Sequence, residues 1–190
     1  MEEEEGQEEA FKVILLGNSG VGKTSIIHRF VQDTFQEGGA RTSMNSIYTR
    51  RFEVEDLGRS VTLQIWDTVG TERFTGSIPR TLYRDAVSVI LVFAIDEPQS
   101  FFDLPKWRNE AIANVDGDFI PLIVGNKVDM HGKKRRVSDA SAYDFAEAKE
   151  IPYRSVSAKT GEGIDEVFQM VGREILEQCY ATLLAGDMPR

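Results

Sequence analysis

A glycine-rich stretch near the start of the sequence, Gly17 to Thr24, has the residue types of a phosphate-binding loop. It reads G-N-S-G-V-G-K-T and matches the pattern G-x-x-x-x-G-K-[ST]. Glycines let the backbone wrap an anion, and successive N–H groups supply partial positive charge. Lys23 is expected to reach the β- and γ-phosphates, and Thr24 to bind Mg²⁺ through its hydroxyl. The stretch predicts a phosphate site, but by itself it identifies neither a base nor a cleaved bond.

The segments on either side of this loop are those that a phosphate-binding loop requires. Phe11 to Leu16 is an apolar run of strand length, and Ser25 to Val31 places apolar residues at helical spacing. The alternative is a glycine-rich turn that matches the pattern by chance. The predicted strand–loop–helix context weighs against that alternative.

Asp67 follows another apolar strand, within the stretch Ile65 to Gly70. A carboxylate at this position is where a phosphate-binding-loop protein holds Mg²⁺. The alternative is an aspartate that caps a turn at the end of a strand. That alternative is weaker in a chain that also carries the loop at Gly17 to Thr24.

Two later motifs indicate which base is bound. Asn126-Lys127-Val128-Asp129 follows an apolar strand, and the stretch Ser155 to Lys159 follows the last predicted strand. An aspartate can accept hydrogen bonds from N1–H and the 2-amino group of guanine, a donor pair that adenine lacks. The later loop can offer a backbone N–H to the guanine oxygen. Each motif is weak alone, and the four together, in this order and at strand ends, predict a guanine-nucleotide site.

Strands alternate with helices along the chain, which predicts an α/β fold. Residues 47–54 and 61–66 are expected to form a hairpin, and the other strands to run parallel. Ser100 is expected to cap the helix that follows it, and a helix over 138–149 is expected to bury Tyr143, Phe145 and Ala146. We therefore expect a six-stranded, mostly parallel sheet with one antiparallel edge strand and helices on both faces.

Charge and composition fit one globular domain. The chain has 190 residues and a net charge of −9, and residues 2–9 contain six glutamates. We expect a disordered acidic tail over 1–10, a folded domain over 11–180 and a second tail over 181–190. The acidic balance argues against nucleic acid as a partner. One cysteine excludes a disulfide framework, and no apolar run reaches transmembrane length.

From Phe11 to Tyr180 the chain resembles the Ras-like small GTPases, and the Rab branch in particular. The resemblance implies a P-loop NTPase fold, the G domain, which binds GTP or GDP with Mg²⁺. It implies nucleotide contacts from sixteen residues, which are Ser19, Gly20, Val21, Gly22, Lys23, Thr24, Ser25, Phe35, Thr42, Gly70, Asn126, Lys127, Asp129, Ser157, Ala158 and Lys159.

Specific roles follow from positions in the resemblance. Phe35, eleven residues past Thr24, matches an aromatic residue that packs on guanine. Thr42, eighteen residues past Thr24, matches the threonine of the first switch that binds Mg²⁺ and senses the γ-phosphate. Gly70 matches the glycine of the second switch. The implied metal ligands are Thr24, Thr42 and Asp67, and the implied catalytic group comprises Lys23, Thr42, Gly70 and Thr71.

The resemblance also implies partner proteins: effectors, exchange factors and GTPase-activating proteins. The residues expected to contact them are Thr42, Ile47, Trp66, Phe74 and Tyr83. Alternation along 61–66 puts Trp66 on the polar face of its strand, where it is either an exposed contact or covered by a neighbouring element. We expect a monomer that takes part in vesicle or intracellular trafficking.

Three departures from the Rab pattern affect these expectations. Thr71 and Val69 stand in W-D-T-V-G-T-E-R-F, where Rab-like proteins have glutamine and alanine. Glutamine orients the attacking water, so we predict slow hydrolysis and a long-lived GTP state. Ser43 to Ile47 replaces the Rab-typical segment, so the partner set is expected to be unusual.

The third departure is at the C-terminus, which ends D-M-P-R without the usual prenylated cysteines. Either the protein is an unlipidated member or a lipidated tail is missing. We expect a cytoplasmic protein, peripheral to membranes through partners or such a tail.

Two alternatives to a hydrolysing switch remain at this point. The first is a GTP-binding scaffold with negligible hydrolysis, which Thr71 favours. The second is an ATP-using enzyme, which Asn126 to Asp129 disfavours.

Overall fold

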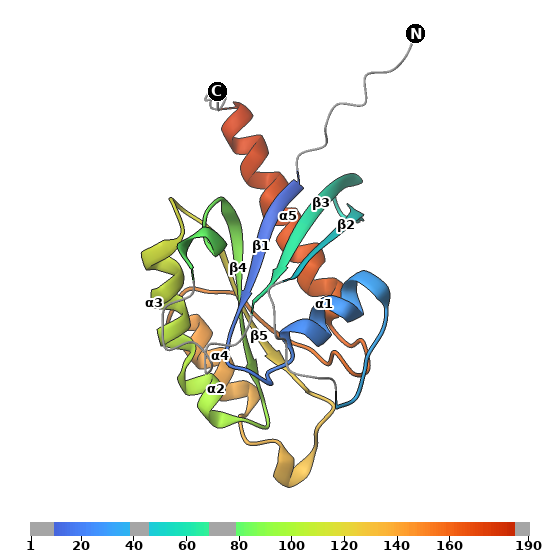
Figure 1. The fold of residues 1–190 in the computed structure, drawn as a ribbon, viewed down its shortest axis with the longest axis vertical. Coiled ribbons are helices and arrows are strands. Elements are labelled where there is room, and N and C mark those ends of the chain that lie inside the picture. Colours follow the sequence, from blue (N-terminus) through green and yellow to red (C-terminus); the bar gives the residue numbers. More distant parts are fainter. Residues whose placement is uncertain (1–9, 39–45, 69–78, 185–190) are drawn as a thin grey trace.

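A computed structural model describes residues 10–38, 46–68 and 79–184 (Figure 1). Its centre is a six-stranded sheet in the order β2-β3-β1-β4-β5-β6. β2 and β3 pair antiparallel at one edge, and all other neighbours pair parallel. The expected α/β architecture is confirmed, including the single antiparallel edge strand.

The strands and helices alternate along the chain as the hydrophobic pattern predicts. The strands are β1 (Ala10–Leu16), β2 (Ser46–Val54), β3 (Arg59–Asp67), β4 (Ala86–Ala94), β5 (Ile120–Asn126) and β6 (Tyr153–Ser155). The helices are α1 (Lys23–Gln32), α2 (Pro98–Phe102), α3 (Leu104–Asn114), α4 (Asp139–Glu147) and α5 (Ile164–Leu184), with short 3₁₀ turns η2 (Arg80–Leu82) and η3 (Gly132–Lys134).

Two hydrophobic cores sandwich the sheet. Successive residues of β1 point to opposite faces, so Val13 and Leu15 join the core under α1 and α5, while Ile14 and Leu16 join the core under α2, α3 and α4. Figure 1 shows these two groups of helices on opposite sides of the strands. Because both faces are covered, the central strands are almost wholly apolar. None of the described helices is long and apolar enough to cross a membrane.

The predicted helix cap at Ser100 is wrong. Ser100 lies inside α2 and is fully buried, and its hydroxyl accepts a 3.0 Å hydrogen bond from Ala94 N–H and donates a 2.6 Å bond to the Glu97 carbonyl. The predicted single helix is two helices, which meet at Asp103, and Pro105 lies in the first turn of α3. Ser100 therefore ties α2 to the end of β4.

Tyr143 of α4 is also not in the core, since 60% of it is exposed. The buried face of this helix is formed by Ala142 and Ala146, which are four residues apart. Ser138 caps the start of this helix, because its side chain accepts a hydrogen bond from Ser141 N–H.

Candidate functional site

The predicted site residues follow the carboxyl ends of four strands. Gly17 to Thr24 follows β1, Asp67 ends β3, Asn126 ends β5, and Ser157 to Lys159 follows β6. β1, β3, β5 and β6 all run in the same direction, so these ends meet at one edge of the sheet. Ligands of open α/β sheets bind at such an edge.

The phosphate-binding loop leads directly into α1. Gly22 precedes the helix with a φ of 98°, in the left-handed region that favours glycine. A Cβ at Gly22 would lie 2.3 Å from Nδ2 of Asn126, so only glycine fits. Lys23 is buried and its Nζ donates to the carbonyls of Gly17 (2.8 Å) and Asn18 (3.1 Å). The ammonium group therefore lies over the loop that is predicted to hold phosphates.

Asn18 is a residue of this loop to which the sequence pattern gives no role. Its amide donates to Asp103 Oδ2 (2.7 Å), and its oxygen accepts from Trp107 Nε1 (2.8 Å). Trp107 is a fully buried residue of α3. Asn18 thereby fixes the loop to α3, a contact that could be predicted only from the packing of that helix.

Thr24 and Asp67 form the candidate Mg²⁺ site. The Thr24 hydroxyl donates a 2.6 Å hydrogen bond to Oδ2 of Asp67. Asp67 is 1% exposed, and its Oδ1 is buried without a hydrogen-bond partner among the described residues. Burial raises the pKa of Asp67, although the Thr24 hydrogen bond and the Lys23 charge oppose that shift.

These two residues fit a magnesium ion. Hydroxyl and carboxylate oxygens are ligands that Mg²⁺ accepts, and an unpaired buried carboxylate oxygen is costly unless a cation satisfies it. No cluster of three or more His, Cys, Asp or Glu side chains that could hold a metal occurs among the described residues. Mg²⁺ is usually bound through one or two carboxylates plus substrate phosphates and water.

Asn126 joins the phosphate-binding loop to the last loop of the site. Its Nδ2 donates to the carbonyl of Val21 (2.8 Å), and its Oδ1 accepts from Ala158 N–H (3.1 Å). Asn126 is 2% exposed. One buried side chain therefore holds three of the predicted motifs in a fixed arrangement.

Asp129 and Lys127 are held by further polar contacts. Ser157 donates a 2.6 Å hydrogen bond to Oδ1 of Asp129, and this aspartate is half-buried. Lys127 has a φ of 71° and its Nζ lies 3.1 Å from Oδ1 of Asp96. Asp96 was not predicted, because it follows β4 outside any of the four motifs.

Lys159 and Phe35 connect this end of the site to the segment after α1. Lys159 donates a 3.0 Å hydrogen bond to Glu37, which raises the pKa of Lys159. Phe35 is partly buried against the core under α1 and α5. Of the remaining predicted contacts, Ser25 lies in the first turn of α1, and Ser19, Gly20 and Val21 lie in the loop.

Four predicted residues lie outside the described part of the chain: Thr42, Gly70, Thr71 and Phe74. The roles assigned to them stay predictions. They include the third metal ligand and three of the four catalytic residues.

Trp66 is neither fully exposed nor fully covered. The Nζ of Lys12 lies 3.9 Å from the centroid of the Trp66 ring, and Nε1 of Trp66 donates a 3.0 Å hydrogen bond to Gln64. Ile47 pairs with Trp66 across the β2–β3 ladder and is 50% exposed. Cross-strand neighbours share one face of a sheet, so Ile47 and Trp66 form a continuous, partly open apolar surface.

Tyr83 is not on that surface, so its predicted role as a partner contact is wrong. It is 0% exposed, packed in the core under α3, and its hydroxyl donates a 2.8 Å hydrogen bond to Glu110. Burial, with a further effect from Glu110, raises the pKa of Tyr83 well above its ordinary value. The sequence match located the aromatic residue but could not reveal which way it points.

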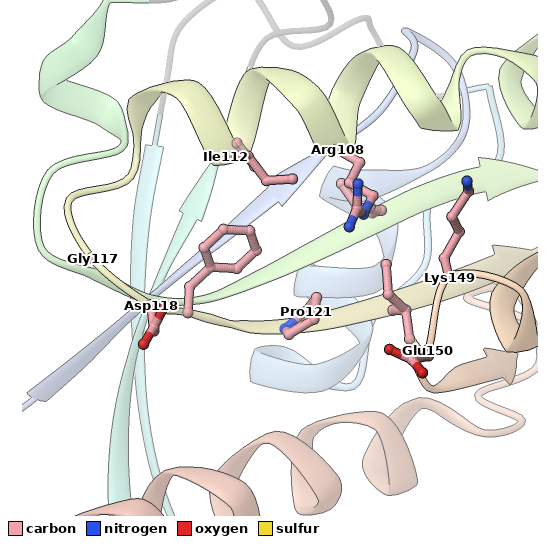
Figure 2. A pocket seen from close by; sticks show the side chains of 11 residues that line it. Arg108, Ile112, Gly117, Asp118, Pro121, Lys149 and Glu150 are labelled. Carbon is pink, nitrogen blue, oxygen red and sulfur yellow. The ribbon is translucent and has the colours of Figure 1, made fainter.

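A cavity of about 290 Å³ lies away from these residues. Figure 2 shows its walls: Arg108 and Ile112 come from α3, Asp118 from the following loop, and Lys149 and Glu150 from the segment between α4 and β6. None of the predicted nucleotide or metal residues that the structure describes lines it. The candidate site is therefore an open edge of the sheet rather than this cavity.

Comparison with known proteins agrees with the site. Residues 12–177 match the Ras family. The chain belongs to the Ras family of small GTPases. It is thus a GTP-binding P-loop protein, and family membership implies a guanine-nucleotide ligand.

Several curated Ras-family relatives are similar over most of their length. The Ypt/Rab-type GTPase Rab7 of Neurospora crassa is 38% identical over 181 residues, which cover 93% of this chain and 87% of the relative. The Ypt/Rab-type GTPase ypt7 of Schizosaccharomyces pombe has the same identity and coverage. The Ras-related protein Rab-30 of Homo sapiens is 35% identical over 178 residues, or 94% of this chain and 86% of the relative. This member of the Ras family is therefore Rab-like.

Proposed function

We propose that this chain is a guanine-nucleotide switch that binds GTP or GDP with Mg²⁺ and hydrolyses GTP slowly. The observation that carries the proposal is the position of Asn126, whose side chain bonds both Val21 and Ala158. That contact brings a phosphate-binding loop and a guanine-selecting loop to one edge of the sheet. A nucleotide with phosphates at one end and guanine at the other matches this arrangement.

The proposed residue roles divide the site into two ends. At the phosphate end, Lys23 and the N–H groups of residues 19–25 bind the phosphates, and Thr24, Asp67 and Thr42 hold Mg²⁺. At the base end, Asp129 accepts from guanine, Phe35 packs on it, and the remaining contacts come from Asn126, Lys127, Ser157, Ala158 and Lys159. When bound, the metal ion neutralises phosphate charge.

Catalysis by this chain consists of positioning and charge stabilisation. Lys23 is already held by two carbonyls of the loop, so little side-chain freedom is lost when a phosphate replaces them. Gly70 is proposed to donate its N–H to the γ-phosphate, and Thr71 stands where a water-orienting glutamine is usual. Without that amide the attacking water is poorly held, which supports slow turnover.

The switch is proposed to act through two segments. γ-Phosphate and its metal would order residues 36–44 and 69–80, and loss of the phosphate would release them. Effectors, exchange factors and GTPase-activating proteins are proposed to contact Ile47 and Trp66, with Thr42 and Phe74. The exposure of Ile47 and its pairing with Trp66 support an apolar recognition surface.

The cellular setting is proposed from the relatives. Rab names among the similar proteins support a role in vesicle or intracellular trafficking. We place the G domain at residues 11–180 between two tails, and we propose a cytoplasmic monomer that reaches membranes through partners or a lipidated tail.

Nucleotide competition tests the binding proposal. Fluorescent GDP bound to the purified protein should be displaced by GTP or GDP and not by ATP at the same concentration. Displacement by ATP would contradict the guanine assignment, because Asp129 has no donor pair to meet on adenine. GTP-loaded and GDP-loaded protein should capture different partners.

A scaffold that holds GTP with negligible hydrolysis is the second candidate, and Thr71 is the feature that favours it. Phosphate release under single-turnover conditions separates the two. Slow but measurable release that depends on Lys23 supports the switch, whereas release no faster than that of free GTP supports the scaffold.

A further inference from the structure

We propose that Arg29 is a positioning residue for guanine selection, which acts by holding the backbone of Ala158 and Lys159. The inference rests on the proposed guanine site. It adds a residue that lies outside all four sequence motifs.

Arg29 lies on α1, and its side chain reaches the loop after β6. Nε donates to the Ala158 carbonyl (3.0 Å) and Nη2 to the Lys159 carbonyl (2.9 Å). Nη1 donates to the carbonyl and the carboxylate of Asp33, at 3.1 Å and 2.8 Å. The side chain is only 17% exposed, so these contacts are partly shielded from water.

Holding a carbonyl also sets the direction of the next N–H. The peptide group is planar and trans, so the Ala158 oxygen and the Lys159 N–H point in opposite directions. Because Arg29 binds the oxygen, it directs the Lys159 N–H away from α1. That N–H has no hydrogen-bond partner among the described residues, whereas Ala158 N–H is bound by Asn126.

The Lys159 N–H is therefore a donor with a fixed direction, and it lies near Asp129, the residue proposed to select the base. Ser157, just before this peptide, holds Asp129. A donor at this place suits the 6-oxygen of guanine, since adenine presents an amino group there that cannot accept. Arg29 thus favours guanine without touching it.

An arginine is needed for this task because two carbonyls must be held at once. The planar guanidinium presents five donors in a rigid fork, whereas a lysine ammonium on a flexible stem cannot reproduce that spacing. Arg29→Met keeps the aliphatic stem and removes all donors. Arg29→Lys should keep at most one of the two carbonyl contacts.

The test measures release of two fluorescent nucleotides from wild type, Arg29→Met, Arg29→Lys and the control Arg84→Met. The Arg84 side chain is 74% exposed, and its one polar contact within the described part of the chain is a surface ion pair with Asp85. The nucleotides are GDP and the diphosphate of 2-aminopurine riboside, which keeps the 2-amino group and lacks both the 6-oxygen and the N1–H donor. The N1–H is missing for every protein in the series, so each variant is compared with wild type on the same nucleotide. Circular dichroism and melting of each GDP-bound protein check the fold.

Arg29→Met should release GDP about tenfold faster than wild type, on the scale of one well-placed hydrogen bond. Its release of the 2-aminopurine nucleotide should be nearly as slow as that of wild type. Arg29→Lys should release GDP at a rate between those of wild type and Arg29→Met. Arg84→Met should release both nucleotides at the wild-type rate. Equal acceleration of both nucleotides would overturn the proposal, because Arg29 would then only support the fold. Unchanged GDP release would also overturn it. If wild type itself fails to bind GDP, the proposed function fails, which is a distinguishable result.

Discussion

The hydroxyl of Thr24 donates a 2.6 Å hydrogen bond to Oδ2 of Asp67, although the two residues are 43 positions apart in the chain. Thr24 lies in the first turn of α1, which follows β1, and Asp67 ends β3; the parallel pairing of β1 with β3 brings these two places together. The other oxygen of the carboxylate is buried and has no hydrogen-bond partner in residues 10–38, 46–68 and 79–184. The unpaired oxygen therefore lowers the stability of the metal-free protein, and a cation bound there would remove that penalty.

Asp67→Asn should have opposite effects on metal-free stability and on nucleotide binding. Burial raises the pKa of Asp67, because the folded environment disfavours the charged form of its carboxyl group. The contribution of this carboxyl to the free energy of unfolding is most favourable below the ordinary aspartate pKa of about 4. It is lost as pH rises through the higher pKa that Asp67 has in the folded protein. In EDTA at neutral pH the variant should be at least as stable as wild type.

With Mg²⁺, Asp67→Asn should bind GDP at least about tenfold more weakly, because a charged metal ligand is lost. Urea unfolding in EDTA at several pH values and GDP titration in Mg²⁺ measure the two effects. A variant that loses stability in EDTA but keeps Mg²⁺-dependent affinity would exclude the proposed role of Asp67.

Gly22→Ala should disrupt the site far more than Gly20→Ala. Both glycines have positive φ, but a Cβ at Gly22 would lie 2.3 Å from Asn126, whereas nothing lies within 4 Å of a Cβ at Gly20. Gly20→Ala should cost about 1–2 kcal/mol of folding free energy from backbone strain alone. Gly22→Ala should in addition displace Asn126 and break its bonds to Val21 and Ala158.

The measurement is GDP affinity and unfolding of the two variants side by side. Gly22→Ala should weaken GDP binding at least about tenfold more than Gly20→Ala, as expected for the loss of two buried hydrogen bonds. Equal effects would mean that the link through Asn126 does not organise the site.

Tyr83→Phe should lower the free energy of unfolding by about 1 kcal/mol, because it removes the buried hydrogen bond to Glu110. The pKa of Tyr83 is raised in the folded protein, so its stabilising contribution is present below the ordinary tyrosine pKa of about 10 and is lost as pH rises above it. Tyr83→Phe should therefore reduce the alkaline loss of stability.

Urea unfolding at neutral pH and at high pH checks both effects of Tyr83→Phe. Capture of GTP-dependent partners should be unchanged, since Tyr83 is not at the surface. A variant with wild-type stability and weaker partner binding would reverse the conclusion that Tyr83 is a core residue.

Thr71→Gln should accelerate GTP hydrolysis. The amide restores a group that can orient the attacking water, and a positioned group of this kind is worth about tenfold or more in rate. Single-turnover phosphate release from GTP-loaded wild type and variant gives the comparison, with Lys23→Ala as the control for background. If Thr71→Gln is no faster, the prediction that Thr71 slows hydrolysis is wrong.

The alternation of strands and helices, the sheet with its antiparallel edge strand, and the strand-end positions of the motifs could all be predicted from sequence. Each depends on hydrophobic periodicity over a few residues or on local backbone chemistry. The surroundings of single side chains could not be predicted in the same way. Tyr83, Ser100 and Tyr143 were each assigned the wrong environment, because a type and a position do not specify which neighbouring element packs over a residue.

By itself the sequence determined that this protein is a Ras-like P-loop protein, and it predicted which motif selects guanine. The spacing of glycines, the lysine and the aspartates encodes that chemistry locally. Only the tertiary structure decided how Asn18, Arg29 and Asp96 support the site. Their contacts join segments far apart in the chain, and such contacts form only when the sheet brings the ends of its strands together.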